Sequence, residues 1–346
     1  MVIAMPTVFD GHNDTLTRDD ADDFAGGRKG GHIDLPRARA GGLAGGIFAA
    51  FTPTPGYTER VKSRPEGGYD SPLAPPVEHA VAAENVDRTL DRLDALERAG
   101  HVRVIRGPGE LDAAREAGTL AAVAHIEGAE AVDPGLEALD RLYERGLRSL
   151  GPVWSRPNAF AHGVPFAYPS SPDTGPGLTP AGRRLVRRCA ELGIAVDLSH
   201  LNEAGFWDVA GLELAPLIAS HSGAHALCPA SRNLTDAQLD AIGASGGLVV
   251  IVYAVAFLRA DGAEDPDTPL DTIAAHVRHV ADRIGVEHVA LGSDFDGATI
   301  PRELGDAAGL PKLLDAIRAA GFSEDEMELI AWGNWRRVLE AAWAAA

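Results

Sequence analysis

The sequence predicts an α/β fold of the (β/α)₈ barrel class, and two observations support this prediction. Eight short apolar runs recur along the 346 residues, with helical patterns between them. Strands that alternate with helices form a parallel sheet, and eight such units close into a barrel. Most of the residues that can bind a metal lie at the C-terminal ends of these runs. A TIM-like barrel carries its functional residues at those strand ends.

Each predicted strand is a short apolar run that is followed by a turn and a helical stretch. This pattern is typical of parallel strands that are buried on both faces. The eight runs cover residues 8–14, 43–51, 120–128, 147–154, 194–200, 217–223, 248–254 and 288–296.

The segments between the strands have apolar residues at helical spacing. Val86, Leu90 and Leu93, for example, recur on one face of a helix predicted over residues 77–99. Thr179, followed by Pro180, and Thr235 are typical N-cap residues. The predicted helices cover residues 77–99, 134–145, 179–192, 202–214, 235–243 and 270–284.

Two long segments, 52–77 and 155–178, interrupt this alternation and are rich in Pro, Gly and Ser. Both follow strands, so we expect them to lie over the face that carries the metal-capable residues. Long ordered loops of this kind are often lids or substrate walls, although a simple connection is an equally good interpretation. No repeat or domain linker is evident, and we predict a single barrel domain over residues 1–346.

The composition is that of an ordinary globular enzyme, with 45% hydrophobic and 23% charged residues. The net charge of −19 argues against nucleic acid or an anionic membrane as a partner, because both require a basic surface. Cys189 and Cys228 are the only cysteines. Few cysteines, no secretory pattern in the first residues and no long apolar stretch together predict a cytoplasmic protein.

The strongest functional signal is the set of histidines and carboxylates at the strand ends. His12 and Asp14 are two residues apart on one strand and therefore point to the same side. Glu127 ends another strand, and its two oxygens could bridge two metals. His200 and His221 end two consecutive strands. His200 or His221 alone would more often be a structural histidine, and the His12–Asp14 pair alone is a weak signal. Together with Glu127 they exceed what one tetrahedral zinc needs, and they predict a two-metal hydrolytic site.

Other polar residues near these ends have predicted supporting roles. Asp294 is our candidate general base for a metal-bound water, with Asp296 behind it. Arg232 suits bidentate capture of a substrate carboxylate, although a loop arginine is often only a solvated charge. We expect His125 and His225 to be structural.

Over nearly its whole length the chain resembles the membrane (renal) dipeptidase family of two-zinc metallopeptidases. The resemblance rests on the segments FDGHND, HIEG, LSH, SHS, SRNLTDAQLDAIGASGGLV, LGSDFDG and GNWRRVLE. It implies a TIM-like barrel of the metallo-dependent hydrolase type, and it also suggests a homodimer.

The resemblance assigns a role to each candidate residue. His12 and Asp14 would hold one zinc ion, His200 and His221 the other, and Glu127 would bridge them. The implied reaction is hydrolysis of a dipeptide amide bond by a hydroxide that bridges the metals. Such substrates often have a D-residue at the C-terminal side. Asp294 would then carry the proton to the leaving amine, and Arg232 would bind the terminal carboxylate.

The substrate-facing positions depart from the family pattern. In GPVWSRPN, Trp154 stands where the family has a histidine, and His162 is a candidate to replace it. In the segment Val252-Tyr253-Ala254 a family asparagine is lost and the tyrosine is shifted. We expect Trp154, Asn158 and Tyr253 to contact the substrate.

These departures keep a second hypothesis open, an amidase or tailoring hydrolase that acts on a modified amino-acid conjugate. A third hypothesis, a non-catalytic metal-binding or interaction protein, is disfavoured because every predicted ligand, Asp294 and Arg232 are retained.

Overall fold

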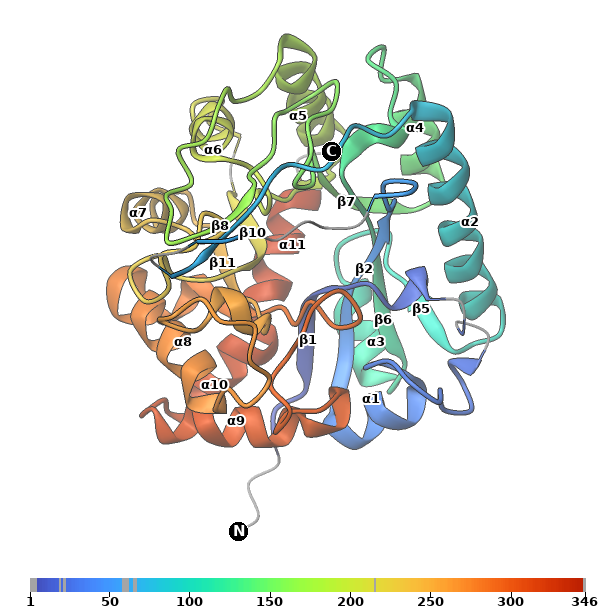
Figure 1. Cartoon of the computed structure of the whole chain (residues 1–346). Helices are drawn as coiled ribbons and strands as arrows, with labels where there is room; N and C mark the ends of the chain where they lie inside the picture. The colour runs from blue at the N-terminus through green and yellow to red at the C-terminus, as the bar shows by residue number, and fades with distance from the viewer. Residues whose placement is uncertain are drawn as a thin grey trace.

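The centre of the fold is a ring of eight parallel strands surrounded by helices (Figure 1). The computed structural model describes residues 5–18, 20, 23–57, 62–64, 67–214 and 216–344. Every predicted strand is present, so the predicted fold class is confirmed. The strands are β1 (Val8–Asn13), β2 (Leu43–Phe51), β6 (Leu120–Glu127), β7 (Leu147–Gly151), β9 (Ala195–Val196), β10 (Ile218–Ser222), β11 (Leu248–Ile251) and β12 (Val289–Leu291).

Main-chain pairing closes these strands into a barrel. Parallel ladders run in the orders β1-β2-β6-β7-β9 and β10-β11-β12. Single parallel bridges, Asp197 to Ile218 and Asn13 to Phe295, join the two ladders at both ends. The amide of Asp14 also donates to the carbonyl of Phe295 at 2.8 Å. The last strand therefore lies beside the first, and residues from both ends of the chain meet at one seam.

Apolar side chains from strands all around the ring fill the interior of the barrel. Phe9, Ile47, Val123 and Val250 belong to one buried cluster with Trp335 of helix α11 (Asn334–Trp343). The rings of Phe9 and Trp335 are 5.4 Å apart. Because these residues come from four different strands and a helix, the interior is a packed core rather than a channel.

The predicted helices are present, with ends that differ by a few residues. Thr179 and Thr235 cap helices as expected: their hydroxyls accept from the amides of Gly182 and Gln238. No helix in the described part of the chain has the length and apolarity that crossing a membrane requires. The other helices are α1 (Leu35–Gly41), α2 (His79–Arg98), α3 (Glu110–Glu116), α4 (Glu137–Glu144), α5 (Pro180–Leu192), α6 (Glu203–Ala210), α7 (Asp236–Ala244), α8 (Leu270–Ile284), α9 (Leu310–Ala319) and α10 (Glu324–Glu328).

The two long loops form a small antiparallel sheet that the sequence did not predict. β4 (Tyr69–Ser71) pairs with β3 (Lys62–Ser63) on one side and with β8 (Phe166–Tyr168) on the other. Residues 58–61 and 65–66 of the first loop lie outside the described residues. A further short strand, β5 (Val102–Val104), pairs with the start of β6. The loops after β2 and β7 are thus joined to each other by hydrogen bonds.

Candidate metal centre and substrate cavity

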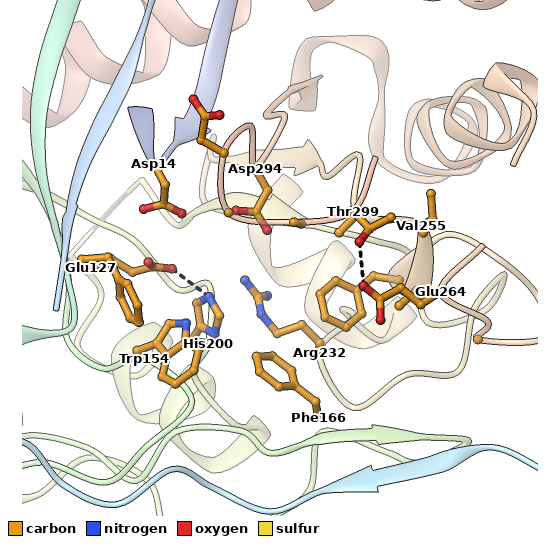
Figure 2. Close-up of a pocket in the computed structure, with 18 of the residues that line it drawn as sticks. Asp14, Glu127, Trp154, Phe166, His200, Arg232, Val255, Glu264, Asp294 and Thr299 are labelled. Carbon is orange, nitrogen blue, oxygen red and sulfur yellow. Dashed lines mark hydrogen bonds and ion pairs between the residues drawn. The ribbon is translucent and has the colours of Figure 1, made fainter. Parts of the chain in front are cut away.

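A cavity of about 980 Å³ lies at the C-terminal ends of the barrel strands. Its walls include Asp14 after β1, Glu127 at the end of β6, His200 after β9 and Asp294 after β12. Figure 2 shows these four side chains directed toward a common space. Tyr69 and other residues of both long loops also line it. The strand ends and the long loops therefore enclose one site.

Three of the predicted ligands meet at the wall of this cavity. Oε1 of Glu127 is 2.9 Å from Nε2 of His200 and 3.5 Å from Nε2 of His221. The two Nε2 atoms are 3.0 Å apart. One ligand atom from each residue lies within 4.8 Å of the others. Two imidazole nitrogens and a carboxylate oxygen converge here, which is a donor set that suits zinc and similar divalent ions.

A second group shares Glu127 with the first. His12, Asp14 and Glu127 also offer ligand atoms within 4.8 Å of one another. Both ring nitrogens of His12 and Oδ1 of Asp14 are buried and have no hydrogen-bond partner within the described residues. Buried polar atoms are nearly always paired, so these orphaned atoms fit a bound cation. The cluster can hold two metals with Glu127 in common.

Burial sets the charge state of the cluster. It lowers the pKa of His12, His200 and His221 well below the usual histidine value, which leaves neutral rings with a free lone pair. Burial and neighbouring carboxylates raise the pKa of Asp14 and Glu127 well above their usual values. Several carboxylates in so dry a place require either protons or a cation. The electrostatics therefore favour metal binding.

Hydrogen bonds behind the histidines fix the direction of their metal-facing nitrogens. The Ser220 hydroxyl donates to Oδ2 of Asp197 at 2.6 Å and lies 2.8 Å from Nδ1 of His221. Because this hydroxyl already donates to Asp197, it accepts a hydrogen bond from the Nδ1–H of His221, which leaves the Nε2 lone pair free for a metal. Nδ1 of His200 has a similar neighbour, the Ser155 hydroxyl at 2.9 Å. Asp197, Ser155 and Ser220 were not predicted from the sequence; the only local signal was the position of Ser220 directly before His221, because Ser155 lies far from His200 in the chain.

Arg232 is a buried cation in the cavity wall. Its two terminal nitrogens donate to the hydroxyl of Ser222 and to the carbonyl of His221, both at 3.0 Å. Burial lowers its pKa to about 10, against the opposing effect of nearby carboxylates that include Asp294. The guanidinium therefore stays charged at neutral pH and is held in one orientation. It lines the same cavity as the metal ligands.

Asp294 is the predicted proton carrier, and its carboxylate lines the cavity beside Asp14 (Figure 2). Burial raises its pKa to about 6, while Arg232 lowers it. Its φ of +58° lies in the left-handed region that non-glycine residues rarely adopt. Strained backbone of this kind is typical of functional positions.

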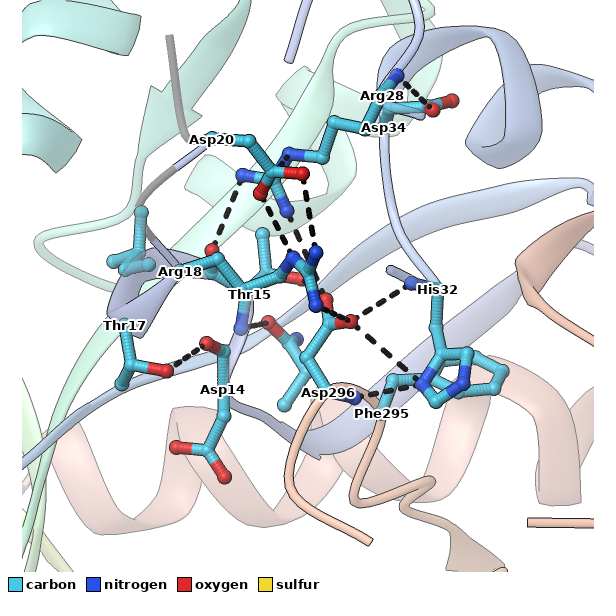
Figure 3. Close-up of polar contacts among 12 residues, drawn as sticks. Asp14, Thr15, Thr17, Arg18, Asp20, Arg28, His32, Asp34, Phe295 and Asp296 are labelled. Atoms are coloured by element: carbon cyan, nitrogen blue, oxygen red, sulfur yellow. Dashed lines mark hydrogen bonds and ion pairs between the residues drawn. The ribbon is translucent and has the colours of Figure 1, made fainter. Parts of the chain in front are cut away.

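Asp296, two residues later, also lines the cavity, but its carboxylate is engaged by hydrogen bonds from the neighbouring loops. One carboxylate oxygen accepts from the Thr15 hydroxyl and the other from the His32 amide, both at 2.8 Å. A terminal nitrogen of Arg28 lies 3.7 Å away. Figure 3 shows the Asp14 carboxylate pointing away from this network. Asp296 thus ties the segment after β1 to the segment after β12 and supports the main chain next to Asp14.

The structure corrects two predicted substrate contacts. Tyr253 is buried with its ring 5.7 Å from that of Phe295, and it does not line the cavity. The Asn158 amide is used inside its own loop, where it donates to the carbonyl of Pro152 and accepts from the amide of Phe160. Strand-end position alone could not reveal that both side chains turn away from the cavity.

Three histidines outside the cluster, His125, His162 and His225, have structural surroundings. His162 packs over Gly175, where an added Cβ would lie 2.8 Å from the ring, and it does not line the cavity. His125 lies 2.9 Å from the Ser149 hydroxyl, and His225 pairs with a main-chain carbonyl at 2.8 Å. His162 thus does not take the place of Trp154, which lines the cavity itself with its ring 5.8 Å from that of His200.

Comparisons with known proteins agree with this geometry. The family model for membrane dipeptidase (peptidase family M19) matches residues 1–346. An uncharacterized Klebsiella pneumoniae protein in the pqqA 5′ region is 49% identical over 71% of this chain and 90% of its own. The crystal structure of dipeptidase AC, a family M19 metallopeptidase, superimposes with a TM-score of 0.92 at 45% identity, covering 98% of this chain and 99% of that one.

A second solved structure is similar to the same extent. It is a metallopeptidase from Rhodobacter sphaeroides liganded with a phosphinate mimic of the dipeptide L-Ala-D-Ala. The TM-score is 0.94 at 45% identity, and the match covers 98% of this chain and 100% of that one. With its clustered metal ligands in a TIM-like barrel, the chain therefore belongs to the membrane dipeptidase family, peptidase family M19, and is a metallopeptidase of the dipeptidase class.

Proposed function

We propose that this protein hydrolyses the amide bond of dipeptides whose C-terminal residue has the D configuration, with two zinc ions as cofactors. One observation carries the proposal: a cluster of five side chains that can bind metal opens, through Asp14, Glu127 and His200, onto a cavity that is also lined by the buried Arg232 guanidinium and the half-buried Asp294 carboxylate. The L-Ala-D-Ala mimic bound to the similar Rhodobacter sphaeroides enzyme supports the choice of substrate.

The five side chains divide into two sets that share Glu127. His12 and Asp14 would hold one ion, and His200 and His221 the other. When bound, such ions would polarise the amide carbonyl and activate the attacking water. The protein contributes rigid placement, because the serine and carboxylate behind His221 keep its Nε2 directed at the cluster.

Arg232 would bind the free carboxylate of the substrate. Hydrogen bonds to Ser222 and to the main chain of His221 hold its guanidinium in place before the substrate arrives. A buried, preoriented guanidinium binds a carboxylate strongly because little water competes for it. By binding this carboxylate, Arg232 would also set the distance between the substrate's C-terminus and the point in the cavity where the scissile bond lies.

Asp294 would move the proton. A carboxylate with a pKa of about 6 is close to the working pH, so it can accept a proton from water and release it to the departing amine. Its place in the cavity wall beside Asp14 supports this role.

The test compares L-Ala-D-Ala with its C-terminal amide in the zinc-loaded wild type and in Arg232→Met. We expect Arg232→Met to lower kcat/KM about 100-fold or more for the free acid, and much less for the amide, which has no carboxylate to lose. Arg302→Met, an exposed arginine outside the cavity, is the matched control. Equal losses on both substrates would contradict the assignment of Arg232.

The cavity of about 980 Å³ is larger than a small dipeptide needs, and this keeps the amidase alternative in view. An assay of N-acyl D-amino acids beside the dipeptides separates the two. Turnover of the acyl compounds without turnover of any dipeptide would replace our proposal with the alternative.

A further inference from the structure

Four aromatic rings form a continuous surface along one side of the cavity, which we call the aromatic wall. It consists of Phe51, Trp154, Phe166 and Phe257, all of which line the cavity. Successive ring centroids are 5.0, 5.8 and 5.8 Å apart. All four side chains are partly exposed. Exposed rings that face a cavity provide a surface for an apolar ligand group.

The wall passes directly beside the metal ligands. The rings of Trp154 and Phe166 are 5.8 and 6.1 Å from the ring of His200. A substrate whose scissile bond lies at the metal cluster would therefore have its adjacent side chain within reach of these rings.

Arg156 holds the Phe51 and Trp154 rings of the aromatic wall in place. The Arg156 guanidinium lies 5.3 Å from the ring of Phe51 and 5.4 Å from the ring of Trp154. It is itself fully buried and donates to Glu130 at 2.7 Å and to Thr54 at 3.2 Å. A paired, buried arginine stacked on two rings holds them in place. The apolar surface is therefore formed before the substrate binds.

The position of Arg232 decides which end of the substrate meets Trp154. Figure 2 shows Glu127 and Trp154 on one side of His200 and Arg232 on the other. With the C-terminal carboxylate on Arg232 and the scissile carbonyl at the ligand cluster, the N-terminal residue extends past the cluster toward Trp154 and Phe51.

We infer that the preferred substrates are dipeptides whose N-terminal residue has a large apolar side chain, which packs against Phe51 and Trp154. The inference rests on the proposed function and deepens it, because it names a substrate class. Phe166 and Phe257 continue the wall toward Arg232 and would contact the C-terminal residue.

The test measures kcat/KM of the zinc-loaded enzyme for L-Ala-D-Ala, L-Phe-D-Ala, L-Leu-D-Ala, L-Asp-D-Ala, L-Lys-D-Ala and L-Ala-D-Phe. We expect the Phe and Leu substrates to exceed L-Ala-D-Ala by about 10-fold or more, and the Asp and Lys substrates to fall below it. Trp154→Ala should reduce the L-Phe-D-Ala to L-Ala-D-Ala ratio at least about 10-fold, whereas Trp154→Phe should retain most of it.

Three further variants separate a local effect on substrate binding from a general loss of folding. Trp207→Ala removes an exposed tryptophan outside the cavity and should leave the ratio unchanged. Phe51→Ala probes the same half of the wall and should act like Trp154→Ala. Phe257→Ala should instead lower activity on L-Ala-D-Phe.

Three results would count against the inference, and they are distinguishable. A preference for charged or small N-terminal residues would overturn it while the dipeptidase function stands. A loss confined to L-Ala-D-Phe in Trp154→Ala would overturn the assignment of the two ends. No turnover of any dipeptide would overturn the proposed function and the inference together.

Discussion

At the scale of single residues, Asp294 has two unusual properties, one in its side chain and one in its main chain. Its half-buried carboxylate has a pKa raised to about 6, and its main chain is held at φ +58°. Asp296 also has a positive φ, and its carboxylate accepts hydrogen bonds from the segment after β1. The turn after β12 is thus held in a costly conformation by contacts that direct Asp294 into the cavity.

We expect Asp294→Asn to lower kcat by about 10²- to 10⁴-fold, because an amide cannot accept and release a proton in this pH range. The metal content, measured by atomic emission, should stay at the wild-type level, since the predicted ligands are untouched. Asp261→Asn, at an exposed position that also lines the cavity, is the matched control. Wild-type kcat in Asp294→Asn would contradict the proton-carrying role.

His276 on α8 is a buried histidine that supports the site from a distance. Its Nδ1 accepts from the amide of Ala224, in the loop that follows His221, at 3.0 Å, and its Nε2 lies 3.0 Å from the carbonyl of Leu258. Burial lowers its pKa to about 4. Between about pH 6.5 and 4 the unfolded chain therefore binds a proton at this residue and the folded chain does not.

This difference predicts that stability falls as the pH drops from about 6.5 to 4 and that His276 contributes to the slope. His276→Gln should flatten the pH dependence of the unfolding free energy by up to about 1.4 kcal/mol per pH unit in that window. Urea unfolding of the zinc-loaded proteins at pH 5, 6 and 7.5 measures it, with His101→Gln as the control. Parallel curves for wild type and His276→Gln would refute the assignment.

At the scale of elements, strand β1 depends on a glycine between two polar residues. A Cβ at Gly11 would lie 2.6 Å from the carbonyl oxygen of Ser220 and 2.7 Å from both Trp335 and Val250. The strand therefore fits only if this residue has no side chain. The close packing sets the position of His12, the next residue.

Gly11→Ala should destabilise the protein by about 1–3 kcal/mol, because neither the main chain of β10 nor the packed core can yield freely. It should also weaken metal binding, since His12 would move with β1. Gly26→Ala is the control, because a Cβ there meets nothing within 4 Å. Chemical unfolding and a zinc-chelator competition measure the two effects, and equal behaviour of the two variants would disprove the packing argument.

The elements differ in how well the sequence predicts them. The barrel strands and main helices were found because apolar runs and N-caps such as Thr179 and Thr235 are local signals. The sheet of β3, β4 and β8 was missed, since its short strands lie in polar loops and pair across distant segments. Tyr253 was misplaced for a related reason: whether a side chain at a strand end faces the cavity depends on twist and packing, which the sequence does not state.

At the scale of the whole molecule, an acidic chain with a net charge of −19 keeps several carboxylates in its interior. Asp14 and Glu127 are buried and Asp294 is half-buried, and each has a raised pKa. Bound cations would relieve this repulsion, so metal binding should stabilise the folded state.

We expect removal of the metal with a chelator to abolish activity and to lower the Tm by about 5 °C or more. Adding zinc back should restore both, as followed by differential scanning fluorimetry and the dipeptide assay. Full activity in a protein shown to be free of metal would contradict the metallopeptidase assignment for this site.

The seam between β12 and β1 has a consequence for how the protein is made. His12 and Asp14 are synthesised well before β12 and the segment after it, which pairs beside them and contains Asp294. Until then the first strand has an open edge, and its metal-binding residues lack the surroundings that shape them. The surroundings of the metal-ligand cluster are therefore complete only after this segment has been synthesised, and a polypeptide truncated before β12 should bind metal poorly.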